Sequence, residues 1–303
     1  MMKVFVIIVT YKGQQWYDRC FSSLRESTIS VQSIVVDNAS NDGTVDYIRE
    51  NYPEVHLIES KENLGFGRAN NIAMRYALDH GCDYVFLLNQ DAWVQQDTVE
   101  KLVAIYDSHP EYGILSPIHL NAEKTGIEKS LLNYLDDKSI TSKRLFEDLY
   151  FHRTKEVYET KYVNAAAWLL PRKTLETVGG FDPIFQHYGE DDNYMHRVLF
   201  QKMKIGVCPD CVVVHDTERR VAQGPSKVMT ENRNLLADVT NINVPVSINS
   251  LCRYHFRKTC SKLVSGKKPQ AKKHWCDYMF LKRNKKSIQI SRNQNKIAGP
   301  NWL

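Results

Sequence analysis

The sequence contains no long run of apolar residues. Its 303 residues are 43% hydrophobic, but no stretch approaches the roughly 18 apolar residues that a membrane-spanning helix needs. The run Val4 to Val9 after Lys3 is also too short for the core of a secretory signal with a small-residue cleavage site. These absences predict a cytoplasmic protein with enough apolar residues for one large core or two smaller ones.

Cysteine is scarce and irregularly placed. The seven cysteines are an odd number in a chain well above the size of disulfide scaffolds, which predicts reduced thiols. The spacing Cys208-x-x-Cys211-x-x-x-His215 resembles part of a zinc site, but a structural zinc ion needs a fourth ligand and usually a second paired motif. None stands out nearby, and Cys211 lies in an apolar strand pattern, so buried thiols are the favoured interpretation.

Acidic residues are nearly absent from the C-terminal part of the chain. Between Cys252 and Lys296 the one acid is Asp277, and the basic residues are Arg253, Arg257, Lys258, Lys262, Lys267, Lys268, Lys272, Lys273, Lys282, Arg283, Lys285, Lys286, Arg292 and Lys296. Because the whole chain has a formal net charge of only +5, the remainder is near neutral or slightly acidic. This asymmetry predicts an anionic partner for the basic segment.

Aromatic residues are interspersed with these lysines and arginines, among them Tyr254, Phe256, Trp275 and Tyr278. A basic amphipathic segment suits the surface of an anionic membrane. The same pattern also suits single-stranded nucleic acid, whose bases stack on aromatic rings, and a solvated terminus is the third interpretation. We favour peripheral membrane contact, at the inner face of the cytoplasmic membrane, over nucleic acid.

Apolar stretches alternate with helix-like patterns over the first 110 residues, which predicts parallel strands joined by crossover helices. The fold class is therefore α/β, a mostly parallel, Rossmann-like sheet flanked by helices, with a basic helical extension at the C-terminus. Residues 121–162 are weakly patterned and predict loops and short helices, with a lid as one option. The expected strands are residues 3–10, 33–40, 55–60, 84–91 and 204–216, and the expected helices are residues 16–27, 42–51, 67–81 and 97–110.

Polar residues follow three of these strands directly, at Thr10-Tyr11, Asp37-Asn38 and Asn89-Gln90-Asp91. Ligands of such sheets bind beyond the carboxyl ends of the strands, so the three clusters are expected at one rim. A carboxylate there, such as Asp91, suits Mg²⁺ or Mn²⁺ bound by few protein ligands and by substrate phosphates, or it caps a turn. Asp37 suits hydrogen bonds from a nucleotide, or an Asx-turn.

Two further motifs have a functional and a structural interpretation. The segment Glu62–Asn71 contains Gly65-x-Gly67 with Arg68 beside it. It lacks the third glycine of a dinucleotide fingerprint, but a close backbone approach at a helix start could help to hold phosphate. Glu190, Asp191 and Asp192 are adjacent acids at the start of an expected helix, where the helix dipole favours them. The functional alternative is a general base that takes a proton from an attacking hydroxyl.

Five motifs together resemble glycosyltransferase family 2, an inverting family with the GT-A fold. The resemblance runs in order from Val4 to about His215 through "VIIVTYKGQQWYDRCFSSL", "IVVDNASNDGT", "ENLGFGRANNIAM", "YVFLLNQDAWV" and "GGFDPIFQHYGEDDNYMHRV". The third is similar to the family's Asn-x-Gly-x-x-x-x-x-Asn loop, and the fourth stands where the family carries an Asp-x-Asp metal motif. Asn89 in place of the first acid is common in the subgroup that resembles rhamnosyltransferases of O-antigen and capsule synthesis.

The resemblance implies a role for each matching residue. Asp191 would be the catalytic base. Asp91 and His215 would bind Mn²⁺ or Mg²⁺, and Glu190, Trp168 and Gly180 would contact the acceptor. The residues that would contact the nucleotide or donor are Thr10, Tyr11, Asp37, Asn38, Asn63, Gly65, Arg68, Asn89 and Gln90.

The function that this resemblance implies is inverting, metal-dependent transfer of a sugar from a UDP- or dTDP-linked donor. The acceptor would be a hydroxyl of a glycan or lipid-linked glycan in surface polysaccharide synthesis. Residues 1–220 would form the catalytic domain and residues 221–303 the extension. One alternative is a non-catalytic glycan- or nucleotide-binding protein on a decayed GT-A fold. The other is a sugar-phosphate nucleotidyltransferase, which would want a glycine- and lysine-rich loop after the first strand, where only Tyr11-Lys12-Gly13 follows.

Overall fold

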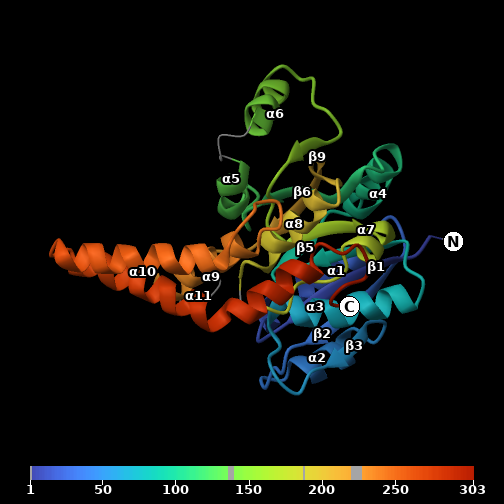
Figure 1. Cartoon of the computed structure of the whole chain (residues 1–303). Helices are drawn as coiled ribbons and strands as arrows, with labels where there is room; N and C mark the ends of the chain where they lie inside the picture. The colour runs from blue at the N-terminus through green and yellow to red at the C-terminus, as the bar shows by residue number, and fades with distance from the viewer. Residues whose placement is uncertain (1, 136–139, 187, 220–226) are drawn as a thin grey trace.

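The computed structural model describes residues 2–135, 140–186, 188–219 and 227–303, and it is built on one large sheet (Figure 1). The strands are β1 (Val4–Thr10), β2 (Val31–Asp37), β3 (His56–Glu59), β4 (Tyr84–Leu88), β5 (Ala92–Val94), β6 (Tyr112–Leu120), β7 (Tyr158–Thr160), β8 (Ala167–Pro171) and β9 (Lys204–His215). Their order is β3-β2-β1-β4-β8-β6-β9-β5, with β7 paired to β9 beside this path.

The expected parallel arrangement is confirmed in the half of the sheet that contains β1. This strand pairs in parallel with β2 and β4, and β2 pairs in parallel with β3. The other half is mixed, because β8 is antiparallel to β4 and β6, whereas β6 and β9 are parallel. Parallel strands bury both faces, which is why β1 and β4 are continuous apolar runs.

Helices cover both faces of the sheet. They are α1 (Gln14–Arg25), α2 (Thr44–Asn51), α3 (Gly65–Asp79), α4 (Thr98–Ser108), α5 (Lys129–Leu135), α6 (Ile140–Tyr150), α7 (Arg172–Thr177), α8 (Glu190–Phe200), α9 (Lys227–Thr240), α10 (Ile248–Val264) and α11 (Lys268–Gln294). Apolar residues of α3, α7 and α8 pack on one face, and those of α1, α2 and α4 pack on the other. The four helices expected in the first 110 residues are confirmed, with boundaries that shift by a few residues.

The expected strand 84–91 is wrong in its second half. It ends at Leu88, where the Asn89 N–H donates to the Ala166 carbonyl at 2.9 Å and the Ala92 N–H donates to the Asn89 carbonyl at 3.0 Å. The chain therefore turns at Asn89–Asp91 and continues as β5, which pairs with the end of β9. Because of this turn, Asp91 faces β9 instead of extending the sheet edge.

The C-terminal extension is helical, as expected. In Figure 1, α10 and α11 extend side by side away from the sheet, and the chain then returns to the body. There the Gly180 N–H donates to the Asn301 carbonyl at 2.8 Å. The predicted domain boundary between residues 220 and 221 lies outside the described residues. Among the helices of the described residues, none is both long and apolar enough to cross a membrane.

Candidate active site

The carboxyl ends of β1 and β2 meet at Thr10 and Asp37, both buried. The Thr10 hydroxyl donates to one oxygen of the Asp37 carboxylate at 3.0 Å, and the Ser40 N–H donates to the other at 2.9 Å. The second bond closes the turn that the structural interpretation expects, while each oxygen keeps a further lone pair for a ligand. Thr10 and Asp37, two residues predicted to bind the sugar donor, therefore lie side by side, and their contact with the nucleotide stays a prediction.

Asn38 shapes the loop that leads into α3. Its Oδ1 accepts the Leu64 N–H at 2.7 Å, and its Nδ2 donates to the Gly65 carbonyl at 3.3 Å. Asn63 Oδ1 accepts the Gly65 N–H at 2.9 Å, and the φ of Gly65 is +77°, a conformation that favours glycine. Both asparagines thus hold the glycine backbone at the helix start, and Arg68 is exposed beside it with a bond to the Pro183 carbonyl at 3.2 Å.

Gln90 is fully engaged with the end of β1. Its Oε1 accepts the Tyr11 N–H at 2.8 Å, and its Nε2 donates to the Tyr11 carbonyl at 3.1 Å. The Tyr11 ring itself is 42% exposed. In this arrangement Gln90 positions the backbone of Tyr11, and the ring of Tyr11 is the part that is open to a ligand.

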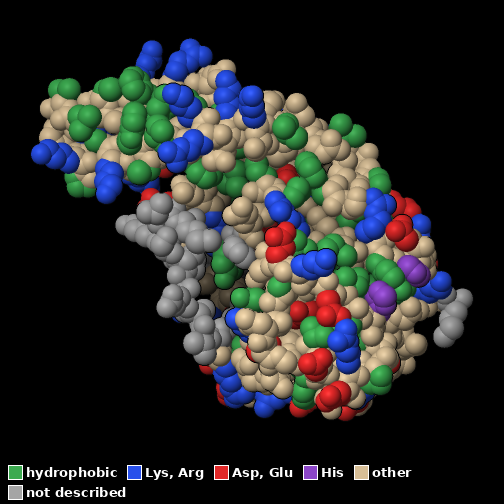
Figure 2. Space-filling model, turned by 90° about the horizontal axis from the view of Figure 1, so that it is seen from below, with side chains coloured by type: hydrophobic (Ala, Val, Ile, Leu, Met, Phe, Trp, Pro, Cys, Tyr) green, Lys and Arg blue, Asp and Glu red, His purple; other side chains and the backbone are tan. Residues whose placement is uncertain are grey.

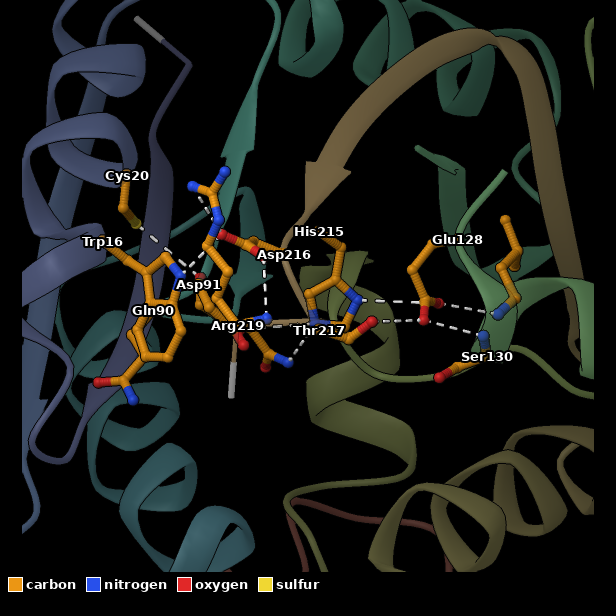
Figure 3. A network of polar contacts seen from close by, with 12 residues as sticks. Trp16, Cys20, Gln90, Asp91, Glu128, Ser130, His215, Asp216, Thr217 and Arg219 are labelled. Carbon is orange, nitrogen blue, oxygen red and sulfur yellow. Dashed lines mark hydrogen bonds and ion pairs between the residues drawn. The ribbon is translucent and has the colours of Figure 1, made fainter. Parts of the chain in front are cut away.

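The predicted metal ligands are brought together by the pairing of β5 with β9, which aligns Ala92 with His215. His215 Nε2 lies 3.5 Å from Asp91 Oδ1, and both side chains are almost fully buried. Asn89 Nδ2 lies 3.3 Å from the same ring nitrogen. Figure 3 shows Asp91, His215 and Glu128 in one row of polar side chains.

This pair fits a divalent cation. A metal bound to imidazole nitrogen and carboxylate oxygen at about 2.0–2.2 Å has neighbouring ligand atoms about 3.0–3.5 Å apart, which matches the observed separation of Asp91 and His215. When the Asn89 amide donates to His215 Nε2, that nitrogen carries a lone pair, which is also what a metal ligand must offer. Asn89 therefore lies against the predicted metal ligands.

Glu128 is a part of this site that the sequence patterns did not reveal. Its Oε2 lies 4.0 Å from His215 Nδ1, and the Ser130 and Leu131 N–H groups donate to its two oxygens at 2.9 and 3.0 Å. Burial raises the pKa of Glu128, but these N–H groups together with His215 and Thr217 outweigh it and lower the pKa overall. A buried carboxylate anion therefore lies behind the imidazole.

His119 completes a second possible ligand set. Its ring meets that of His215 edge to face, with centroids 5.9 Å apart, and burial lowers its pKa well below the usual value. Ligand atoms of His119, Glu128 and His215 all lie within 4.8 Å of one another. No sequence motif marks His119 or Glu128, because Glu128 lies in the weakly patterned segment 121–162 and His119 lies just before it.

The three adjacent acids begin α8, as expected, after Gly189 in a left-handed conformation with φ of +91°. Burial, followed by the charge of the neighbouring Asp191, raises the pKa of Glu190 to about 8 and that of Asp192 to about 7. Burial also raises the pKa of Asp191, against the effect of the Asp192 N–H, which donates to it at 3.0 Å. Arg233 of α9 lowers the pKa of all three, so a cation faces a group of acids with raised proton affinity.

The donor loop and the acid group pack against each other. A Cβ placed on Gly67 of α3 would lie 3.0 Å from Phe181 Cβ and 3.7 Å from Glu190 Cβ. Asn71 also joins α3 to the segment that precedes the acids, because it accepts the Phe181 N–H at 2.6 Å and donates to the Phe181 carbonyl at 2.8 Å. Glu190 therefore lies directly beside the start of α3, although the two are far apart in the sequence.

Two residues predicted to contact the acceptor lie elsewhere. Trp168 is fully buried and packs against both Phe181 and Tyr194, so its side chain offers no surface to an acceptor. Gly180 is covered by the end of the chain, since a Cβ there would lie 2.4 Å from Asn71 Oδ1 and 2.5 Å from Leu303. Both positions serve packing in this structure.

The thiols agree with the favoured interpretation. Cys208 and Cys211 are buried and free, and His215 is turned toward Asp91 and Glu128. The motif Cys208-x-x-Cys211-x-x-x-His215 is therefore not one site: its two thiols are buried in β9, and its histidine belongs to the candidate metal pair.

Comparisons with known proteins agree with this geometry. The family model "Glycosyl transferase family 2" matches residues 5–176. The low-salt glycan biosynthesis hexosyltransferase Agl10 of Haloferax volcanii is 25% identical over 224 residues, 70% of this chain and 66% of that protein. The dTDP-rhamnosyl transferase RfbF of Shigella flexneri is 24% identical over 214 residues, which are 70% of this chain and 68% of that protein. The aligned part thus spans about two thirds of each relative.

A solved structure shows the same fold. The mannosyltransferase PcManGT of Pyrobaculum calidifontis, in complex with GDP-Man and Mn²⁺, superposes with a TM-score of 0.57 at 22% identity, over 80% of this chain and 63% of that one. The order of the strands and the helices on both faces therefore correspond to the GT-A fold. The chain belongs to glycosyl transferase family 2, whose members are sugar-transferring enzymes.

Proposed function

We propose that this protein transfers a sugar, with inversion, from a UDP- or dTDP-linked donor to a hydroxyl group of a glycan or lipid-linked glycan in surface polysaccharide synthesis. The dTDP-rhamnosyl transferase among its relatives supports the donor class. The observation that carries the proposal is the meeting of Asp91 with His215 at the turn after β4, on the rim of the sheet where Thr10 and Asp37 also lie.

Asp91 and His215 would hold Mn²⁺ or Mg²⁺, and Glu128 would hold the imidazole of His215 in place. When bound, such an ion neutralises the diphosphate and makes it a better leaving group. This rim would orient the nucleotide, since Thr10, Asp37 and the backbone of Tyr11 are fixed by the hydrogen bonds described above. The contribution of these residues is orientation and fixed charge.

Asp191 would accept the proton of the acceptor hydroxyl as it attacks the anomeric carbon. A base works best when its pKa is near the working pH, and burial raises the pKa of this carboxyl from its usual acidic value. Glu190, beside the donor loop, would contact the acceptor. With the proton on Asp191 and the diphosphate leaving on the opposite face, configuration at the anomeric carbon inverts.

The test is calorimetric binding of UDP, dTDP, GDP and their common sugar conjugates, with Mn²⁺ and with chelator, to the wild type and to Asp91→Ala. We expect metal-dependent binding of one nucleotide that Asp91→Ala loses. Asp191→Asn should keep donor binding and lose transfer. Nucleotide binding without any transfer by the wild type would favour the non-catalytic alternative, and unchanged metal dependence in Asp91→Ala would contradict the metal assignment.

We also propose that α10 and α11 contact an anionic membrane at the cytoplasmic face, where a lipid-linked acceptor would lie. Figure 2 shows basic and apolar side chains interspersed over this hairpin. Trp275, Phe256 and Val264 are 44%, 47% and 91% exposed. Three cations of α10 line a shallow hollow of about 460 Å³ suited to phosphate head groups, namely Arg253, Arg257 and Lys258. Residues after about 220 would thus form a membrane-binding extension of a catalytic domain.

A further inference from the structure

A second group of metal-ligating side chains lies outside the candidate active site, between the two helices of the basic hairpin. His255 belongs to α10, and His274 and Asp277 belong to α11. His255 Nδ1 lies 3.2 Å from His274 Nδ1 and 3.3 Å from Asp277 Oδ2. The three ligand atoms all lie within 4.8 Å of one another, and both histidines are half-buried.

These distances match the edges of a metal polyhedron. With metal–ligand bonds of about 2.0–2.1 Å, two ligands of a tetrahedral ion are about 3.3–3.4 Å apart. A single proton on His255 Nδ1 cannot point at both His274 Nδ1 and Asp277 Oδ2, whereas one cation can be bound by all three atoms. The spacing of His274 and Asp277, three residues apart on one helix, places both side chains on the same face, opposite a ligand from the facing helix.

Asp277 supplies the negative charge of this group, which otherwise lies in a basic segment of the chain. Asp277 is the one acid between Cys252 and Lys296, and its side chain is only 12% exposed. Its Oδ2 faces His255 Nδ1 at 3.3 Å. Lys273 of α11 has its ammonium 4.0 Å from Glu231 of α9. The one carboxylate of the basic hairpin therefore contacts the imidazole of His255 and lies within 4.8 Å of a ring nitrogen of His274.

We propose that His255, His274 and Asp277 form a binding site for an imidazole-preferring divalent cation such as Zn²⁺, which links α10 to α11. Two imidazoles and one carboxylate leave a fourth position for water. This ligand set differs from the oxygen-rich environment that Mg²⁺ prefers, so the site is distinct in chemistry as well as in place from the pair Asp91 and His215. The cation would fix the hairpin and with it the aromatic residues that the hairpin exposes.

The test uses the full chain carrying His215→Ala, which removes a ligand shared by both candidate sets of the active site. Its exposed thiols are alkylated beforehand, and it is titrated with Zn²⁺ by calorimetry and with Co²⁺ by visible absorption. We expect one equivalent of Zn²⁺, a raised midpoint of thermal unfolding and the absorption of tetrahedral Co²⁺. His274→Gln and Asp277→Asn should each weaken binding at least tenfold. His80→Gln, which removes an exposed histidine outside both clusters, is the matched control and should bind as its parent does.

Equal Zn²⁺ binding by the parent, His274→Gln and Asp277→Asn would overturn the proposal. If either variant loses helical circular dichroism, hydrogen exchange of the unaltered chain decides the question without substitution. Zn²⁺ should then slow amide exchange within α10 and α11. Exchange in these helices that is unchanged at saturating Zn²⁺ would also overturn it.

Discussion

The contacts of single residues explain how His215 could serve a metal. Its Nε2 faces Asp91 and Asn89, while its Nδ1 faces Glu128 at 4.0 Å. A carboxylate behind a ligating imidazole holds the ring in place and favours the tautomer with its lone pair on the metal side. The N–H groups of Ser130 and Leu131 hold the Glu128 carboxylate in this position.

We therefore expect Glu128→Gln to weaken Mn²⁺ binding about 10- to 100-fold, the usual effect of removing such a partner. Calorimetric titration of Mn²⁺ into the protein measures this directly. Glu123→Gln is the matched control, because its carboxylate is about half exposed and pairs with Arg219 at 3.8 Å. Equal Mn²⁺ affinity in Glu128→Gln and the wild type would show that Glu128 does not support His215.

Glu190 makes stability depend on pH in an unusual direction. Burial, together with the charge of Asp191, raises its pKa from 4.5 to about 8. The folded state thus binds the proton more tightly than the unfolded state does. Its contribution to stability is present below about pH 4.5 and is lost as the pH rises toward about 8, with a slope of at most about 1.4 kcal/mol per pH unit.

Glu190→Gln should therefore flatten the fall in the free energy of unfolding between pH 4.5 and 8 and leave the protein more stable than the wild type at pH 8. Urea unfolding at a series of pH values measures both. Glu176→Gln is the control, since Glu176 is an exposed acid paired with Arg172. Parallel curves for Glu190→Gln and the wild type would mean that Glu190 is charged throughout.

At the scale of elements, the start of α3 holds the segment that leads to the acids. Asn71 makes two hydrogen bonds to Phe181, one to its N–H and one to its carbonyl. Asn71→Ala leaves both buried backbone groups without that partner, which costs about 1–3 kcal/mol each. We expect the free energy of unfolding to fall by about 2–5 kcal/mol, measured by urea titration.

The neighbouring substitution Ile72→Ala is the control for this prediction, because Ile72 is 39% exposed and surface substitutions usually change stability by less than about 0.5 kcal/mol. A loss in Asn71→Ala no larger than in Ile72→Ala would contradict the fastening role. The motif Asn-x-Gly-x-x-x-x-x-Asn then would have to be explained by ligand contacts alone.

The elements also show why the sequence predicts some features and not others. Apolar runs such as Val4–Thr10 mark parallel strands, because only strands covered on both faces are apolar throughout. The turn at Asn89–Asp91 was not predicted, since β5 is defined by its pairing with a distant strand, β9. Glu128 was missed for the same reason, as its role depends on contact with His215. The polar side chain of Gln90 bonds to the backbone of Tyr11. The aromatic side chain of Trp168 is buried in the core.

At the scale of the whole molecule, the basic hairpin is tied to the body at its base. Ser291 and Asn295 donate to the buried carboxylate of Asp182 at 2.6 and 2.7 Å, and Leu281 and Ile288 of α11 pack with Val239 of α9. Truncation before Cys252 would remove these partners of Asp182 and expose the apolar side chain of Val239 that α11 covers, which is destabilising. Membrane binding is therefore tested better by exchanging exposed side chains than by deletion.

The last prediction concerns three exposed lysines of α11, Lys268, Lys272 and Lys282. Each basic residue near an anionic surface contributes about 1 kcal/mol, so changing all three to Gln should weaken binding to vesicles of phosphatidylglycerol and phosphatidylcholine about a hundredfold. Co-sedimentation at physiological ionic strength measures the partition. The control changes three exposed lysines of the body to Gln instead, Lys61, Lys155 and Lys173, and has the same net charge.

Because the two triple variants have the same net charge, comparing them distinguishes binding through the α11 surface from a general electrostatic attraction. If both triple variants lose vesicle binding equally, the whole charge of the molecule and not the hairpin is responsible. If neither binds less than the wild type, membrane contact by α11 is wrong. A single-stranded oligonucleotide added in a parallel titration distinguishes the remaining partner, because the aromatic residues Trp275 and Tyr278, with ring centroids 5.3 Å apart, could stack on bases. Stronger oligonucleotide than vesicle binding, lost in the α11 variant, would replace the membrane with nucleic acid as the partner of the hairpin.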